Sequence, residues 1–275
     1  MTAVTTTVSK TDHPTAAPAA DAGTGTSSAL QRTLVLLAGS AIYLYFLGVF
    51  LYAVGFVSGF LVPKTLNDGA AVPLGEALLV NGSILALFAI QHTIMARPAF
   101  KAWWTKIVPP ALERSLFVLA TCLILTTLFW QWRPLPGGAV WSVDNQVLAT
   151  ALHVVSGLGW GLVLYATFLI DHFDLFGLRQ VVLHFRGVPY SNPRFQEKSF
   201  YRFVRHPLLL GFAIAFWATP HMSWSHLFYA LMTTLYMLVG IEFEERDLIK
   251  AHGDDYRSYR RRVPMLLPFR FRRAA

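Results

Sequence analysis

The sequence predicts an all-α polytopic membrane protein, a bundle of four transmembrane helices followed by a C-terminal helical hairpin, with five to six membrane segments in all. Three observations support this fold class. Of the 275 residues, 55% are hydrophobic and 14% are charged, whereas soluble domains average about 25% charged. Four apolar stretches approach or exceed the roughly 20 residues that cross a bilayer core. The basic residues gather in alternate connections between these stretches, so that one side of the membrane would receive most of them.

The N-terminal segment differs in composition from the rest of the chain. Residues 1–28 are rich in Ala and Thr and have no hydrophobic periodicity, so we expect a disordered tail. The remainder, residues 29–275, is expected to form a single integral-membrane domain. The first apolar stretch is much longer than the hydrophobic region of a signal peptide and follows a polar segment, so we expect it to stay in the mature protein.

The membrane segments follow in order along the chain. The four predicted helices cover Leu34 to Leu61, Leu74 to Met95, Leu116 to Trp130 with its flanks, and Val147 to Ile170. Two further apolar arms lie between Pro207 and Phe243 and are joined at TPHMSW, residues 219–224. Because dense basic residues flank both ends of this pair, it must enter and return on the same side as a hairpin, either spanning or re-entrant. Cys122, the single cysteine, excludes an intrachain disulfide.

The basic residues predict the orientation of the bundle. If the N-terminus is cytoplasmic and the segments alternate, all of the 23 Lys and Arg residues except Lys64 and Arg133 fall on the cytoplasmic side. We therefore expect a multi-pass protein of the inner cell membrane with both termini in the cytoplasm. The net charge of +8 is then an insertion signal, and no soluble domain is long enough to present a nucleic-acid-binding surface.

Polar residues of distinct chemistry gather where the hairpin meets the cytoplasmic surface. Glu244 and Glu245 close the hairpin beside the bilayer core, where an unpaired carboxylate is costly. Arg205 and His206 open it, so the two ends of the hairpin bring cations and carboxylates together. We expect a polar pocket at this point, roofed by apolar side chains.

Other candidate residues carry weaker signals. The neighbouring His172 and its two flanking aspartates do not converge on one helix face, so no metal site is predicted. His92, near the cytoplasmic end of the second helix, is a candidate for the substrate pocket, as are Phe173 and Trp217, one of which we expect to wall a ligand. The sequence contains no Walker loop, dinucleotide fingerprint or serine nucleophile elbow.

Several motifs carry a family resemblance. An Arg-His-Pro-x-x-x-Gly segment that opens the hairpin, a Glu-Glu pair that closes it and the following AHGDDYRSYRRRVPMLLP resemble the isoprenylcysteine carboxyl methyltransferase superfamily of membrane methyltransferases over about residues 199–268. The segments QHTIMARPAFKAWW, DHFDLFGLRQ, WATPHMSWSHLFYA and VGIEFEERDL are similar to the bacterial methanethiol S-methyltransferases, from about residue 34 onward.

The resemblance implies a reaction and a set of site residues. The reaction is methyl transfer from S-adenosylmethionine to methanethiol, giving dimethyl sulfide and S-adenosylhomocysteine, with hydrogen sulfide as a second acceptor. The residues implied to hold the cofactor lie within 199–268: Arg205, His206, Glu244 and Glu245 bind it, Gly211 allows its close approach, and Tyr256 and Tyr259 cover it from the tail. The wider superfamily often has Tyr where this chain has Leu209, so a hydrogen bond from that hydroxyl is absent.

The implied chemistry suits a membrane boundary. A thiolate and a sulfonium neutralise each other in the transition state, which favours a site that excludes water. A free alkanethiol is mostly protonated at neutral pH, so the site needs a base, and His172, His206 and Glu245 are the candidates. Three alternatives stay open at this point: a lipid or isoprenyl-cysteine acceptor, an NADPH-dependent reductase of the sterol type, and a non-enzymatic membrane subunit. The oligomeric state is not predicted.

Overall fold

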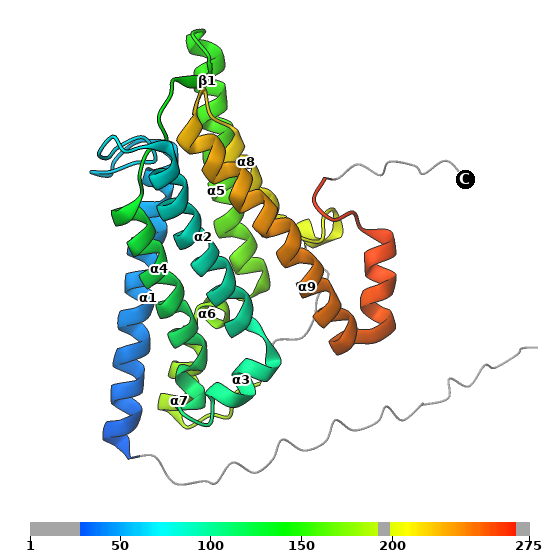
Figure 1. The fold of residues 1–275 in the computed structure, drawn as a ribbon. Coiled ribbons are helices and arrows are strands. Elements are labelled where there is room, and N and C mark those ends of the chain that lie inside the picture. The colour runs from blue at the N-terminus through cyan, green and yellow to red at the C-terminus, as the bar shows by residue number, and fades with distance from the viewer. Residues whose placement is uncertain (1–27, 192–198, 268–275) are drawn as a thin grey trace, which may run out of the picture.

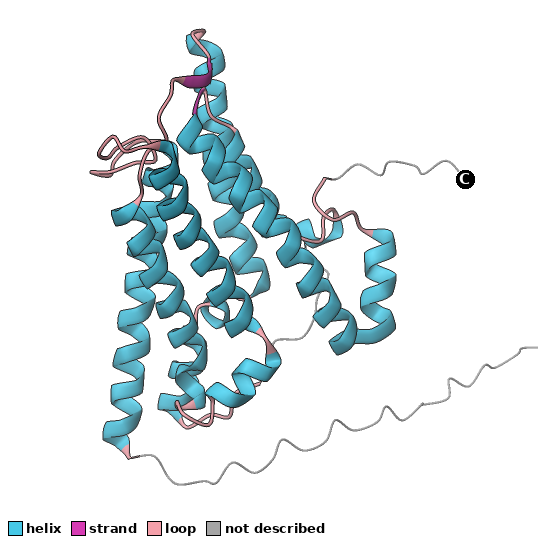
Figure 2. Cartoon of the chain, in the orientation of Figure 1, coloured by secondary structure: helices cyan, strands magenta, loops and turns pink. Residues whose placement is uncertain are grey.

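The computed structural model describes residues 28–191 and 199–267. The tail expected over residues 1–28 lies outside this range apart from its last residue, Ser28. The described part of the chain is a bundle of long helices that run between two ends of the molecule (Figure 1). Among the residues described, helix dominates and strand is confined to one short pair near one end (Figure 2). The all-α membrane fold predicted from the sequence is confirmed.

Five helices of the described residues are long and apolar enough to cross a membrane. They are α1 (Ala29–Ser58), α2 (Leu74–Ala96), α4 (Glu113–Gln131) with the preceding 3-10 turn η1 (Pro110–Leu112), α5 (Gln146–Ile170) and α9 (Trp224–Arg262). A sixth apolar helix, α8 (Pro207–Trp217), is shorter. The remaining elements are α3 (Pro98–Trp104), α6 (His172–Leu175), α7 (Leu178–Arg186), the 3-10 turn η2 (Ser199–Arg202), and the strands β1 (Ala139–Ser142) and β2 (His221–Ser223).

Local signals set the helix boundaries. Ser28 begins α1 by accepting a hydrogen bond from the backbone N–H of Gln31 at 3.2 Å, and Asn145 begins α5 in the same way. The first helix was predicted to reach Leu61, but it ends at Ser58 because Gly59 adopts a left-handed conformation with φ 79°. The other three predicted helices agree with α2, α4 and α5 to within a few residues.

The helices pack side by side, with the α2–α4, α5–α8 and α8–α9 neighbours antiparallel and the α1–α4 and α2–α9 neighbours parallel (Figure 1). Helix α4 contacts both α1 and α2, α5 packs along α8, and α9 contacts α8 and α2. The α5–α8 pair is especially close because glycines face it from both sides. A Cβ atom added at Gly159 would lie 2.6 Å from the backbone nitrogen of Ala215, and one at Gly211 would lie 2.8 Å from the carbonyl oxygen of Gly159. Ser156 also donates to the Ala215 carbonyl oxygen at 3.0 Å.

Aromatic side chains fill the interior between these helices. Phe56, Trp132 and Phe216 are nearly inaccessible, and they belong to one cluster that joins α1, α4, α5, α8 and α9. In contrast, many large apolar residues on the outside are exposed, such as Leu51 at 67% and Leu158 at 68%. An exposed apolar surface of this kind is suited to contact with lipid hydrocarbon.

The C-terminal hairpin is asymmetric. Helix α8 has 11 residues and is about 16 Å long, which is shorter than a bilayer core, whereas α9 has 39 residues. The tip of the hairpin pairs with the α4–α5 connection through the antiparallel strands β1 and β2, at the end of the bundle away from α3 and α7 (Figure 1). The long arm therefore extends between both ends of the bundle. The end that contains α3, α6 and α7 is called the basic end below, because most of the described basic residues lie there.

Candidate functional site at the basic end

Glu245 is the centre of the site where the hairpin closes. It lies on α9 with only 3% of its side chain exposed. One carboxylate oxygen accepts from Arg205 Nε at 2.6 Å and lies 3.2 Å from His206 Nε2, while the other accepts from Arg260 Nε at 2.9 Å. A buried carboxylate with three cationic or donor groups is fully compensated. The juxtaposition of hairpin ends expected from the sequence is therefore present.

Arg205 joins this carboxylate to the end of the described chain. Its side chain is 9% exposed, and its Nη1 donates to the carbonyl oxygens of Arg260 at 3.0 Å and Val263 at 2.5 Å. The backbone N–H groups of Arg205 and His206 donate to the carbonyls of Pro264 and Met265. The guanidinium thus fixes the C-terminal segment against the start of α8.

A kink in α9 makes this closure possible. Gly253 has φ 57° and ψ −128° within the helix, a conformation that other residues adopt only with strain. The chain turns at this point, and residues 254–262 return as a separate helical piece (Figure 1). Arg260 reaches Glu245 only because of this turn, and sequence reasoning missed it. The one available signal is its position a helical turn after Tyr256.

Tyr256 and Tyr259 form the packed interior of the returning piece. Each is 1% exposed, and their rings meet edge to face with centroids 5.7 Å apart, against Val263 and partly buried residues of α9. The Tyr259 hydroxyl donates to the carbonyl oxygen of Tyr201 at 2.7 Å. These tyrosines therefore hold the tail onto η2 beside the Glu245 site.

His206 and Glu244 form the more accessible part of the site. His206 Nδ1 lies 3.5 Å from a carboxylate oxygen of Glu244, whose side chain is 55% exposed. Burial lowers the pKa of His206, but its hydrogen bonds to Glu244 and Glu245 outweigh burial and raise the pKa above its ordinary value. The protonated form of the ring is therefore favoured. Glu244 and Arg260, whose side chain is 43% exposed, are the more solvent-exposed charges of the site and have opposite signs.

Gly211 does not face open space for a ligand. Its nearest neighbours are the carbonyl oxygen of Gly159 and the backbone nitrogen of Val163 on α5, each 2.8 Å from an added Cβ. The physical reason for a glycine here is the close packing of α8 on α5, and the role in cofactor approach implied by the resemblance stays a prediction.

The three residues expected in a substrate pocket lie in different places. Trp217 donates to Thr234 at 2.9 Å at the far end of α8, ten residues and about 15 Å from Pro207. His92 stacks on Phe88 and lies 3.4 Å from Thr121 on α4, so it is placed between α2, α4 and α9. Phe173 packs beside His172. The structure does not bring these three residues together.

His172 lies in a second polar cluster at the basic end. It is 4% exposed, and its ring nitrogens lie 2.7 Å from Thr167 Oγ1 and 2.8 Å from the Tyr43 hydroxyl. Burial lowers the pKa of His172 below its ordinary value, although the nearby Asp171 carboxylate acts in the opposite direction. His172 and His206 thus have opposite preferences for the proton. Among residues 28–191 and 199–267, no group of three or more His, Cys, Asp or Glu is arranged to hold a metal ion.

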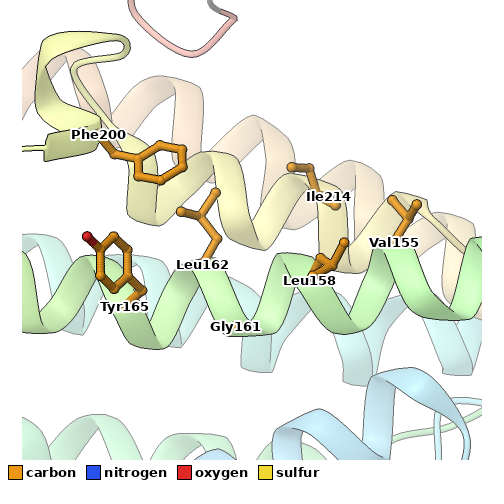
Figure 3. A pocket seen from close by; sticks show the side chains of 7 residues that line it. All are labelled: Val155, Leu158, Gly161, Leu162, Tyr165, Phe200 and Ile214. Carbon is orange, nitrogen blue, oxygen red and sulfur yellow. The ribbon is translucent and has the colours of Figure 1, made fainter.

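An apolar groove of about 450 Å³ runs between α5 and α8 (Figure 3). Its lining is apolar except for the hydroxyl of Tyr165, which lies at the end near η2 and hydrogen-bonds to Ser199 at 3.0 Å. The lining residues are Val155, Leu158, Gly161, Leu162, Tyr165, Phe200 and Ile214. Most of them are exposed at the side of the bundle, so the groove faces the lipid phase.

Comparisons with known proteins place this geometry in a family. A family model described as a protein of unknown function, DUF1295, matches residues 113–263. Methanethiol S-methyltransferase of Mycobacterium tuberculosis is 50% identical over 240 residues, 87% of this chain and 98% of that protein. Methanethiol S-methyltransferase 2 of Bradyrhizobium diazoefficiens is 52% identical over 242 residues, 88% of this chain and 93% of that protein. Nurim of Rattus norvegicus is more distant, 31% identical over 60% of this chain.

No solved structure matches the chain. The family model and the relatives agree on the region that contains the site, because residues 113–263 include α5, the hairpin and the returning piece of α9. Since half of the aligned residues are identical over nearly the full length of the relatives, the chain belongs to the methanethiol S-methyltransferase family, within DUF1295.

Proposed function

We propose that this protein is a membrane methyltransferase that transfers the methyl group of S-adenosylmethionine to methanethiol and releases dimethyl sulfide and S-adenosylhomocysteine. Relatives that are about 50% identical over almost their whole length carry the name of this activity. The observation that carries the proposal is the buried Glu245 carboxylate with its Arg and His partners, at the point where the two arms of the hairpin meet. Hydrogen sulfide, a smaller thiol of the same class, is the second acceptor.

The charges around Glu245 fit the amino acid end of S-adenosylmethionine. That end carries an ammonium and a carboxylate, and the site presents a half-exposed carboxylate, Glu244, and a half-exposed guanidinium, Arg260, near Glu245. Arg205 is a weaker candidate for direct contact, because Glu245 and two carbonyl oxygens already occupy its Nε and Nη1 donors. When bound, the cofactor supplies a methyl group on a positively charged sulfur. Tyr256 and Tyr259 support this wall of the site from the tail.

The remaining requirement is a group that accepts the proton of the thiol. Glu245 already accepts from three partners, and the pKa of His206 is raised above its ordinary value because its hydrogen bonds to Glu244 and Glu245 outweigh its burial. Both ring nitrogens of His206 face carboxylate oxygens and both oxygens of Glu245 face cations, so neither group is arranged to take up a proton. His172 is held neutral by burial, so among the three candidates it is the favoured base.

The acceptor is small and apolar and dissolves in lipid, so we propose that it approaches the site from the membrane. Five helices of suitable length and composition support a multi-pass location. The distribution of Lys and Arg supports an orientation in the inner membrane with both termini, and hence the basic end, in the cytoplasm, where S-adenosylmethionine is made. Reporter fusions at residues 68 and 137 would test this orientation, and we expect both to report the outer side.

The direct test is headspace gas chromatography of purified, detergent-solubilised protein supplied with S-adenosylmethionine and methanethiol. We expect dimethyl sulfide from the wild type and none above background from Glu245→Gln or His206→Ala. Glu242→Gln is a matched control, because that carboxylate is 53% exposed and pairs with Arg246 along the helix surface. A folded wild type that binds S-adenosylhomocysteine but makes no dimethyl sulfide would refute methanethiol as the acceptor.

A further inference from the structure

A chain of hydrogen bonds links α1, α5 and α6 beside the site. It runs from the Leu164 carbonyl through Thr167 Oγ1 and His172 to the hydroxyl of Tyr43 on α1, with successive distances of 2.6, 2.7 and 2.8 Å. The side chains of Thr167 and His172 are buried, and Tyr43 is partly exposed. Phe168 covers the imidazole face to face, with ring centroids 4.3 Å apart.

The direction of each hydrogen in this chain follows from its first member. A carbonyl oxygen only accepts, so the single hydroxyl hydrogen of Thr167 points to Leu164. Thr167 Oγ1 must then accept from His172, which places the ring hydrogen on Nδ1. In the neutral imidazole, Nε2 therefore carries a lone pair, and it accepts the hydrogen of the Tyr43 hydroxyl. The oxygen of Tyr43 remains able to accept a further hydrogen.

The chain of hydrogen bonds lies at the same depth along the bundle axis as the Glu245 site. In the antiparallel α5–α8 pair, Gly159 lies beside Gly211 and Ala215, and Gly211 lies beside Gly159 and Val163. Both helices rise by 1.5 Å per residue, so continuing this register by one turn places Thr167 level with the start of α8, where His206 precedes Pro207. Thr167 is thus at the level of His206, on a neighbouring helix whose axis lies roughly 8–10 Å from that of α8.

We propose that Tyr43 accepts the proton of the thiol while it passes its own proton to Nε2 of His172. This inference rests on the proposed function and names the proton acceptor for that same site. The S–H bond of the thiol and the O–H bond of Tyr43 break, and new O–H and Nε2–H bonds form, so that the sulfur becomes a thiolate as it attacks the methyl group. The imidazolium then returns its proton to solvent after methyl transfer.

The charges around His172 support a transient cation there. Asp171 precedes His172 and favours a positive ring, and its carboxylate also accepts from the backbone N–H of Asp174. Asp174 forms an ion pair with Arg179 at 2.7 Å and accepts a hydrogen bond from the Tyr190 hydroxyl at 3.2 Å, so its carboxylate is already paired. Of the charged side chains near the ring, Asp171 is therefore the one that balances the imidazolium.

The test compares two tyrosines on the same helix. Tyr43→Phe removes only the hydroxyl in question, and Tyr45→Phe removes a hydroxyl that bonds to Thr126 on α4 at 2.6 Å. At neutral pH we expect Tyr43→Phe to lower kcat for methanethiol by roughly a hundredfold, the range of acid–base catalysis, with the affinity for S-adenosylhomocysteine unchanged. Tyr45→Phe should keep kcat within about threefold of the wild type.

The pH profile distinguishes a proton acceptor from a structural support. As pH rises and methanethiol ionises by itself, the kcat of Tyr43→Phe should approach that of the wild type. With hydrogen sulfide, which is about half ionised at neutral pH, the variant should lose much less activity than with methanethiol. A loss that is equal at all pH values and for both acceptors would overturn the proposal, as would full activity of Tyr43→Phe at neutral pH.

A second pair of variants tests the same chain without touching Tyr43. Thr167→Val removes the acceptor for His172 Nδ1 and should reproduce the pH-dependent loss, whereas Thr167→Ser keeps the hydroxyl and should restore activity. Loss in both variants, or in neither, contradicts the relay. A wild type without dimethyl sulfide formation would instead refute the proposed function, so the two failures are distinguishable.

Discussion

Replacing Glu245 by Gln keeps the shape of the side chain and removes its charge. Gln can still accept from Arg205 and His206, but each bond loses the negative charge of its acceptor, which costs about 1 kcal/mol per contact. The contact with Arg260 counts for less, because that side chain is 43% exposed and its charge is screened by water. The total is about 2–3 kcal/mol of lost stability for the closure of the hairpin.

The assay is thermal unfolding of the purified protein in one detergent, followed by intrinsic tryptophan fluorescence. By the usual scaling for domains of about this size, the expected fall in Tm for Glu245→Gln is roughly 5–10 °C. Glu242→Gln, whose ion pair with Arg246 lies on the surface, should change Tm by no more than about 1–2 °C. If Glu245→Gln unfolds within about 1 °C of the wild type, the carboxylate does not tie the hairpin to the tail.

Three further predictions concern the packing and charge of the same region. Gly211→Val should abolish folded protein in size-exclusion chromatography, because its Cβ would meet the backbone of α5, whereas Gly157→Ala, with open space beside it, should be recovered normally. Gly253→Ala should lower Tm by a few degrees and expose the tail to proteolysis, because φ 57° strains any other residue; wild-type proteolysis would contradict this. Since the folded pKa of His206 is raised, its stabilising effect is fully present below its ordinary value of about 6.5 and is lost as pH rises through the higher folded value. Tm should fall over that window in the wild type and stay flatter in His206→Gln; equal slopes would refute it.

Much of the fold could be predicted because membrane helices depend on simple properties of the sequence. Length, hydropathy and the distribution of Lys and Arg define the four long helices and the hairpin, and the cost of a bare carboxylate near lipid predicts that Glu245 meets Arg205 and His206. These inferences use the lengths of segments along the chain and the rule that a carboxylate near lipid pairs with a cation. They do not depend on which face each helix turns toward its neighbours.

Other features depend on rotation and on turns that the sequence does not specify. Arg260 reaches Glu245 only after the chain turns at Gly253. A glycine within a helical stretch does not show from the sequence alone in which direction the chain will turn. The close packing of Gly211 against the backbone of α5 depends on the α5–α8 register, which the sequence does not specify. Tyr43 is 129 positions from His172, and no periodicity connects them.

The most direct test of the central claim follows the methyl group itself. Purified protein would be supplied with S-adenosylmethionine that carries a deuterated S-methyl group and with unlabelled methanethiol, and the headspace would be analysed by mass spectrometry. We predict dimethyl sulfide with one deuterated and one unlabelled methyl group from the wild type and from Glu242→Gln, and none from Glu245→Gln. Unlabelled dimethyl sulfide, or no product from folded protein, would contradict methyl transfer at the site around Glu245.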